Sequence, residues 1–146
     1  MNPEIDLNQL VAAIGDAVVI CDASGAITLW NAGAERMFGY RAEEALGQSL
    51  DLIIPERLRQ RHWDGYHKTM ASGQTRYGSD VLRVPAVDKA GGSRSIAFTV
   101  GLLYSADNKV SSIVSVIRDE TARFSDERNL RKRLAELEAK AKLLQA

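Results

Sequence analysis

Cysteine, histidine and aromatic residues are scarce in this 146-residue chain, which has one cysteine, two histidines and 6% aromatic residues. Its single cysteine, Cys21, cannot form an intramolecular disulfide, and it excludes a zinc site built from several cysteines. No apolar run approaches the roughly 20 residues that a membrane-spanning helix needs. The first residues, MNPEIDLNQL, are acidic and lack the basic and then apolar order of a signal peptide. We therefore expect a cytoplasmic protein without a membrane partner.

Net charge is also absent, since nineteen basic side chains balance nineteen acidic ones. No overall basic field therefore indicates a nucleic-acid partner. The charge is unevenly spread, because residues 1–117 carry eleven basic and thirteen acidic side chains, whereas residues 118–146 carry eight and six. All eleven glycines and all three prolines lie in the first segment. This predicts a turn-rich body, followed after about residues 118–121 by a continuous helix.

Two short β-type runs, Ala17–Cys21 and Ala26–Trp30, are separated by residues typical of a hairpin turn, Asp22-Ala23-Ser24-Gly25. Helices are predicted over residues 32–38, over residues 41–46, and from Pro55 to about Ala71, where Ser72-Gly73 ends the helix. Three further β segments are expected at about residues 77–87, 94–104 and 110–118. Two strands before the helices and three after them imply an α+β fold, in which helices cover one face of a five-stranded antiparallel sheet.

Several short motifs occur in a fixed order along this body: DAVVICD at 16–22, AERMFGY at 34–40, EEALG at 43–47, IPE at 54–56 and IRDET at 117–121. In this order the motifs and elements resemble the PAS sensor domain over residues 7–121. The resemblance implies a hollow between sheet and helices that holds a cofactor or a metabolite. It also implies an N-terminal helical cap (1–16), a sensor domain (17–120) and a C-terminal signalling and dimerisation helix (121–146).

Both histidines lie on the predicted long helix, after the Ile54-Pro55-Glu56 motif. This arrangement is similar to that of heme-binding PAS sensors of the FixL and Dos types, in which a histidine after the proline ligates the heme iron. By its place in the motif that ligand is His62, so the resemblance implies heme b as cofactor and a diatomic gas or a redox change as signal. Arg57, Arg59 and Arg61 are available to pair with the heme propionates.

Two faces of this helix compete for the inward position. One face carries residues three or four apart: Leu58, His62, Tyr66 and Thr69. The other is more apolar: Trp63, Tyr66, His67 and Met70. If the second face packs against the core, His67 points inward and His62 lies towards the edge. The sequence leaves three outcomes open, namely ligation by His62, ligation by His67, and no ligation.

The chain departs from the FixL-type pattern at two positions. An aspartate commonly follows the ligand closely in those chains, whereas Trp63 follows His62 here. Leu82 stands where those oxygen sensors carry an arginine, and leucine cannot donate a hydrogen bond to bound oxygen. With heme present we expect an apolar distal pocket that favours CO or NO over oxygen. Its expected lining is Leu82, Val84, Ile96, Phe98 and Val116.

The sequence also bears on other ligands and on enzymatic activity. A flavin photoadduct needs a cysteine in the short-helix region, and residues 47–55 contain none. Trp63 and Tyr66 also suit a small metabolite, so the alternative is a metabolite sensor or a heme-free dimerisation and interaction module. The sequence contains no catalytic triad in a recognisable setting, no P-loop and no H-E-x-x-H motif. It therefore favours a sensor over an enzyme.

The predicted C-terminal helix begins at Asp119-Glu120-Thr121, which resembles the D-x-T junction that ends many PAS domains. Apolar residues then recur at spacings of four and three: Leu130, Leu134, Leu137, Ala141 and Leu144. This heptad pattern predicts a coiled-coil-like helix that pairs with a second copy. An amphipathic N-terminal stretch is expected to contribute to the same homodimer: Leu7, Leu10, Val11 and Ile14. The expected output partner is a downstream domain or protein.

Overall fold

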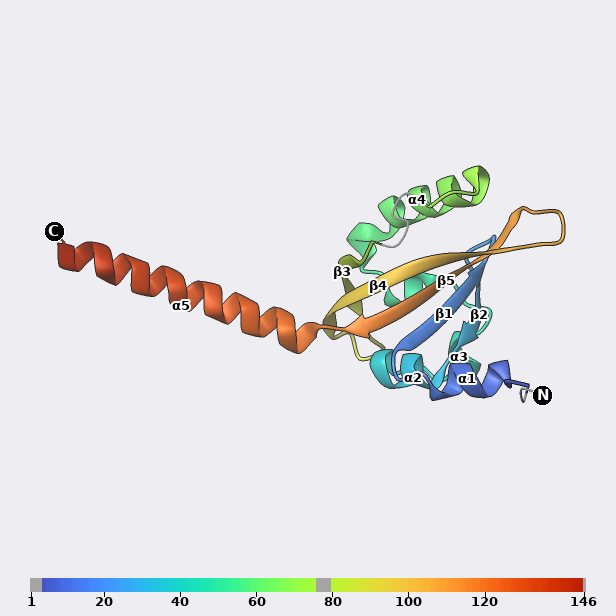
Figure 1. The fold of residues 1–146 in the computed structure, drawn as a ribbon, viewed down its shortest axis with the longest axis horizontal. Helices are drawn as coiled ribbons and strands as arrows, with labels where there is room; N and C mark the ends of the chain where they lie inside the picture. Colours follow the sequence, from blue (N-terminus) through green and yellow to red (C-terminus); the bar gives the residue numbers. More distant parts are fainter. Residues whose placement is uncertain (1–3, 76–79, 146) are drawn as a thin grey trace.

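The computed structural model describes residues 4–75 and 80–145, and a five-stranded antiparallel sheet forms the centre of the body (Figure 1). Its strands are β1 (Ala17–Asp22), β2 (Ile27–Trp30), β3 (Leu82–Val87), β4 (Ser93–Tyr104) and β5 (Val110–Asp119). Their order across the sheet is β2-β1-β5-β4-β3, so the first and last strands of the chain pair in the middle. Every neighbouring pair is antiparallel, which confirms the predicted sheet.

The helices are α1 (Leu7–Ala13), α2 (Ala32–Phe38), α3 (Ala42–Ala45), α4 (Arg59–Ser72) and α5 (Thr121–Gln145), with 3-10 turns η1 (Leu50–Ile53) and η2 (Glu56–Leu58) before α4. The long helix begins four residues later than Pro55, because the backbone first closes a 3-10 turn in which Leu58 N donates to Pro55 O at 2.8 Å. It ends as predicted at Gly73, whose φ of +70° suits glycine.

The third β segment is shorter than the predicted 77–87. Tyr77 lies outside the described residues, and Asp80 and Val81 are not in a strand. Among the described residues the ladder between β3 and β4 ends where Leu82 pairs with Phe98, and Val81, before it, is 49% exposed.

The hydrophobic core lies between one face of the sheet and the helices that cover it. Alternate residues of the central strands face it, such as Ile113 and Ile117 of β5, each less than 10% exposed. The helices contribute Phe38 of α2, Ala45 of α3 and Tyr66 of α4 to the same cluster. The predicted placement of helices against one face of the sheet is therefore confirmed for these three helices.

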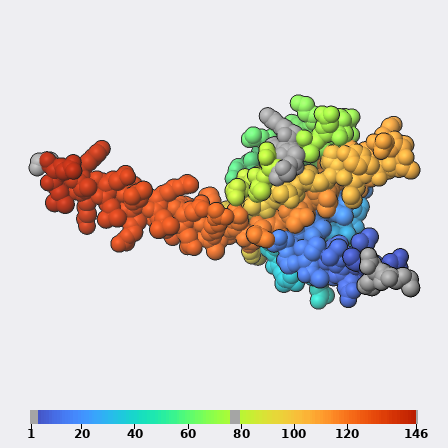
Figure 2. Space-filling view, in the orientation of Figure 1, coloured from blue at the N-terminus to red at the C-terminus, as the bar shows by residue number. Residues whose placement is uncertain are grey.

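The C-terminal helix α5 projects from the body as a slender arm (Figures 1 and 2). None of its described residues is buried. The predicted helix is thus confirmed, while its coiled-coil character stays a prediction. Within residues 4–75 and 80–145, no helix is both long enough and apolar enough to cross a membrane.

Candidate functional site

The inner face of β3 and β4 brings four of the predicted pocket residues together. Leu82 lies opposite Phe98, and Val84 lies opposite Ile96, in the antiparallel register. Residues directly opposite in an antiparallel pair share one face. Ile96 is 5% exposed and belongs to the core, but Val84 is 40% exposed and Leu82 and Phe98 are only partly buried. Part of this apolar face is therefore uncovered.

Val116, the fifth predicted pocket residue, lies on the opposite face of the sheet. The next residue, Ile117, is 3% exposed and packs in the core, and successive strand residues point to opposite faces. Val116 pairs with Val18 and Thr99 and is 37% exposed. The structure does not bring it to the other four, which corrects the expectation that it lines the hollow.

The two histidines of α4 lie in different surroundings. His67 is exposed, whereas His62 is partly buried. The Nδ1 atom of His62 is buried and has no hydrogen-bond partner among the residues that the structure describes. Burial lowers the pKa of His62, and the nearby carboxylate of Asp51 opposes this shift only in part. At neutral pH the imidazole is therefore uncharged, which is the form that ligates metals.

The two aromatic residues of α4 bind to other parts of the protein. The hydroxyl of Tyr66 donates to the backbone carbonyl of Asp22, at the end of β1. The indole Nε1 of Trp63 donates to Oδ1 of Asp51 in η1, at 2.7 Å. Both side chains thus anchor α4, and their contact with a ligand stays a prediction. The sequence contained no local signal for these anchors, because Asp22 and Asp51 lie 44 and 12 residues away along the chain.

Leu58 ends η2 and Arg59 begins α4, and the side chain of Arg59 binds the loop before the helix. Its Nε donates to the carbonyl of Ile54 at 3.1 Å, and its Nη2 donates to the carbonyl of Asp51 at 3.4 Å. Leu58 is partly buried and packs against the core. Arg59 is thus less available to an anionic ligand than was expected, whereas Arg57 and Arg61 are exposed.

Cys21 of β1 is a buried free thiol on the core face. Burial, assisted by the charge of Asp22, raises its pKa to about 12, so the thiol stays protonated. Among the residues that the structure describes, no three histidine, cysteine, aspartate or glutamate side chains group to hold a metal ion. Heme differs from such a site, because a single protein side chain such as histidine can hold its iron.

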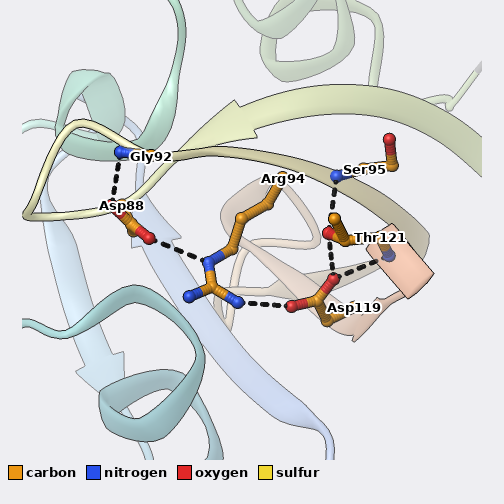
Figure 3. A network of polar contacts seen from close by, with 6 residues as sticks. All are labelled: Asp88, Gly92, Arg94, Ser95, Asp119 and Thr121. Atoms are coloured by element: carbon orange, nitrogen blue, oxygen red, sulfur yellow. Dashed lines mark hydrogen bonds and ion pairs between the residues drawn. The ribbon is translucent and has the colours of Figure 1, made fainter. Parts of the chain in front are cut away.

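A polar network ties the sheet to α5 (Figure 3). Arg94 of β4 donates through Nε to Asp88 at 3.0 Å and through Nη1 to Asp119 at 2.7 Å. Asp119 accepts from the backbone N–H of Thr121 at 2.9 Å, and Ser95 N donates to Thr121 Oγ1 at 3.0 Å. Arg94 therefore joins the β3–β4 hairpin to the end of β5, and Asp119 joins the end of β5 to the start of α5.

The carboxylates of this network are held in their charged form. Burial acts to raise the pKa of Asp119, but hydrogen bonds from Thr121 and Arg94 outweigh burial and lower it. The pKa of Asp88 is lowered by the backbone N–H of Gly92 and by Arg94. The resemblance of Asp119-Glu120-Thr121 to a D-x-T junction thus corresponds to hydrogen bonds at the point where strand becomes helix.

A five-stranded sheet in the order 2-1-5-4-3, with helices on its inner face and a further helix after β5, is the architecture of a sensory module. The family model described as "PAS fold" matches residues 5–119, and the chain belongs to the PAS family. Members of this family are in general sensory or interaction modules in signal transduction.

Two curated relatives are sensors. The chain is 40% identical over 63 residues to the sensor protein FixL of Bradyrhizobium diazoefficiens, which is 43% of this chain and 12% of FixL. It is 24% identical over 129 residues to the oxygen sensor protein DosP of Escherichia coli, which is 88% of this chain and 15% of DosP. The matched region is thus less than a sixth of the length of either relative.

Two solved structures share the fold. A PAS domain from Colwellia psychrerythraea superposes with a TM-score of 0.69 at 21% identity, covering 78% of this chain and 93% of that one. An RNA-binding light-oxygen-voltage receptor superposes with a TM-score of 0.69 at 15% identity, covering 92% and 41%. At these identities the likeness concerns the fold alone.

Proposed function

We propose that this chain is a cytoplasmic, non-catalytic sensor that binds heme b through His62 and responds to a diatomic gas or a redox change. The observation that carries the proposal is the buried, unpartnered Nδ1 of a neutral His62. A second support is the partly uncovered apolar face formed by β3 and β4. The similarity to the oxygen sensor DosP agrees with a gas as the signal.

The residues present fit a heme. His62 would hold the iron, and Leu58, Leu82, Val84 and Phe98 would contact the apolar ring. The exposed Arg57 and Arg61 would pair with the propionates more readily than Arg59, which the loop before α4 engages. When bound, heme supplies an iron centre that takes up a diatomic gas or changes its oxidation state. Because leucine has no donor, Leu82 would favour CO or NO over oxygen.

The signal would leave through α5. Leu82 and Val84 stand on β3, and the hairpin that joins β3 to β4 contains Asp88. Arg94 links Asp88 to Asp119, directly before α5. A shift of the β3–β4 hairpin on ligand binding would therefore change the direction of α5, because the three elements share one network. The receiver would be a second copy together with a downstream domain or protein.

A second copy would cover the heptad seam of α5. The leucines of the seam are largely exposed in the single chain: Leu130 (66%), Leu134 (57%), Leu137 (53%) and Leu144 (86%). Most of the stability of a helix in a protein comes from packing of its apolar face, so pairing would stabilise α5. Leu7 and Leu10 of α1, 71% and 48% exposed, would add to the same homodimer.

The charges beside the seam favour a parallel pair. With Leu130 and Leu137 at d positions, each g residue meets the e residue of the next heptad on the partner. Asp126 would then face Arg131, and Arg133 would face Glu138, so both pairs attract. In an antiparallel pair with the same leucine layers, Arg133 would face Lys140 and repel it.

A hemin titration of the purified protein tests the proposal. We expect a Soret band in the wild type and in His67→Ala, and its loss or a marked shift in His62→Ala. His67 is the matched control, since it is an exposed histidine on the same helix. A protein that stays colourless with hemin, or that binds it equally without His62, contradicts heme ligation. A small molecule released on denaturation would then support the metabolite sensor.

A further inference from the structure

Helix α4 has few deep contacts with the rest of the body. Of its fourteen residues only Tyr66 is buried. Its hydroxyl binds the carbonyl of Asp22, directly before the β1–β2 turn. The orientation of any residue on α4 therefore depends on the few side chains that attach this helix. Trp63 is the second of them, and it stands one residue after the proposed ligand.

Trp63 is seated on the β1–β2 turn at Gly25. A Cβ atom added to Gly25 would overlap Cη2 and Cζ3 of the indole, so a larger side chain fits there only if the indole is displaced. Gly25 also has a φ of +87°, in the left-handed region that favours glycine. Glycine is thus favoured at position 25 for two reasons: the backbone conformation and the indole that lies against it.

The opposite edge of the indole is held by η1. Nε1 of Trp63 donates to the carboxylate of Asp51 at 2.7 Å. Asp51 is itself placed by Ser49, whose hydroxyl accepts from the backbone N–H of Asp51 at 3.1 Å. The indole therefore lies between the β1–β2 turn, which it contacts at Gly25, and η1, to which it is hydrogen-bonded. Both segments precede α4 in the chain.

His62 packs against this fixed ring. The imidazole and indole centroids are 4.6 Å apart, with the planes at 80°, and the ring of Tyr66 lies 5.9 Å away. A hydrogen bond to the imidazole ring commonly orients a metal-ligating histidine. Within the described part of the chain, the buried Nδ1 of His62 has no such partner. The contacts that orient the imidazole are therefore its aromatic contacts with Trp63 and Tyr66.

We propose that Trp63, seated on Gly25 and bound to Asp51, is a positioning residue that orients the His62 imidazole towards its ligand. The inference rests on the proposed function of His62, but the orientation of the ring can be measured in the apo-protein. It assigns to the β1–β2 turn a role in the site on α4, from which it is remote in sequence.

Gly25→Ala is the decisive variant, and Gly91→Ala is its matched control. Both glycines have a similar positive φ, +87° and +84°, but nothing lies within 4 Å of a Cβ at Gly91. Both changes therefore cost backbone strain, and only the first displaces the indole. We expect Gly25→Ala to shift the NMR signals of the His62 ring in the apo-protein and to weaken hemin binding about 10-fold. Gly91→Ala should change neither.

Trp63→Phe serves as the second variant, in case Gly25→Ala fails to fold. It keeps an aromatic ring beside His62 but removes the donor to Asp51, so the His62 signals should shift while the circular dichroism spectrum stays native. Unchanged His62 signals in a folded Trp63→Phe or Gly25→Ala protein would overturn the inference. A wild type that binds no hemin would contradict the proposed function instead, since the apo-protein signals still report on the ring.

Discussion

At the scale of single residues, the side-chain amide of Asn31 joins three elements while being only 6% exposed. Its Oδ1 accepts from Val18 N of β1 at 2.8 Å and from Ala34 N of α2 at 3.0 Å. Its Nδ2 donates to the carbonyls of Val11 and Asp16 at 3.0 and 3.1 Å, which holds α1 to the body. The amide offers both the acceptor and the donors that these bonds need, whereas a carboxylate only accepts.

Asn31→Ala should lower the free energy of unfolding by about 2–4 kcal/mol, because it removes the cap of α2 and leaves the buried Val18 N–H without its partner. Asn31→Asp should also destabilise, since it sets a carboxylate against two carbonyl oxygens. Urea denaturation measures both. Asn129→Ala, on the exposed surface of α5, is the control. A loss below about 1 kcal/mol for Asn31→Ala would contradict this role.

At the scale of elements, the junction of β5 and α5 is stabilised by charge-assisted hydrogen bonds that need Asp119 ionised. The pKa of Asp119 is lowered in the folded protein from its ordinary 3.8. Its contribution to stability is therefore present above the unfolded-state pKa and is lost as the pH falls through the folded-state pKa. Arg94 and Thr121 are the partners that set this dependence.

We expect Asp119→Asn to be less stable than the wild type at pH 7, and the difference to shrink as the pH falls below about 4. Urea denaturation at a series of pH values between about 3 and 7 checks it. Glu136→Gln, an exposed change on α5 with the same effect on net charge, is the matched control. If the difference in unfolding free energy between wild type and Asp119→Asn is constant across this pH range, ionised Asp119 does not stabilise the junction.

At the scale of the whole molecule, the body and the arm differ in how they are stabilised. The body has a core shared by sheet and helices, whereas no described residue of α5 is buried and the helix extends away from the body (Figure 2). Intrahelical ion pairs such as Arg123–Glu127, at 3.2 Å, stabilise an exposed helix only weakly. The proposed parallel dimer would add the contacts that the arm lacks within one chain.

Charge reversal tests the parallel arrangement. Arg131→Glu should weaken the dimer about 10-fold, because two attractive pairs with Asp126 become repulsive. The double change Asp126→Arg with Arg131→Glu should restore the affinity, as sedimentation equilibrium would record. Leu134→Asp, within the seam, should abolish pairing. A double variant as weak as Arg131→Glu alone would refute the parallel register.

Local pattern was sufficient to predict the elements of the fold. Hairpin residues at 22–25, the stop at Gly73 and the heptads of α5 act over a few residues, so their signals are contained in short stretches of sequence. The face of β5 was harder to predict, because a central strand carries apolar residues on both sides. Val116 was assigned to the wrong side for this reason, and the register with β1 and β4 resolves it.

The site depended on contacts between remote segments. The histidines share one helix, and both candidate faces include Tyr66, so periodicity could not choose between His62 and His67 as the inward residue. Packing made the choice, because Tyr66 and Trp63 attach to Asp22, Gly25 and Asp51 and turn His62 inward. Short-range propensity and hydrophobic period thus sufficed for strands and helices, whereas side-chain environments arose only when distant parts of the chain came together.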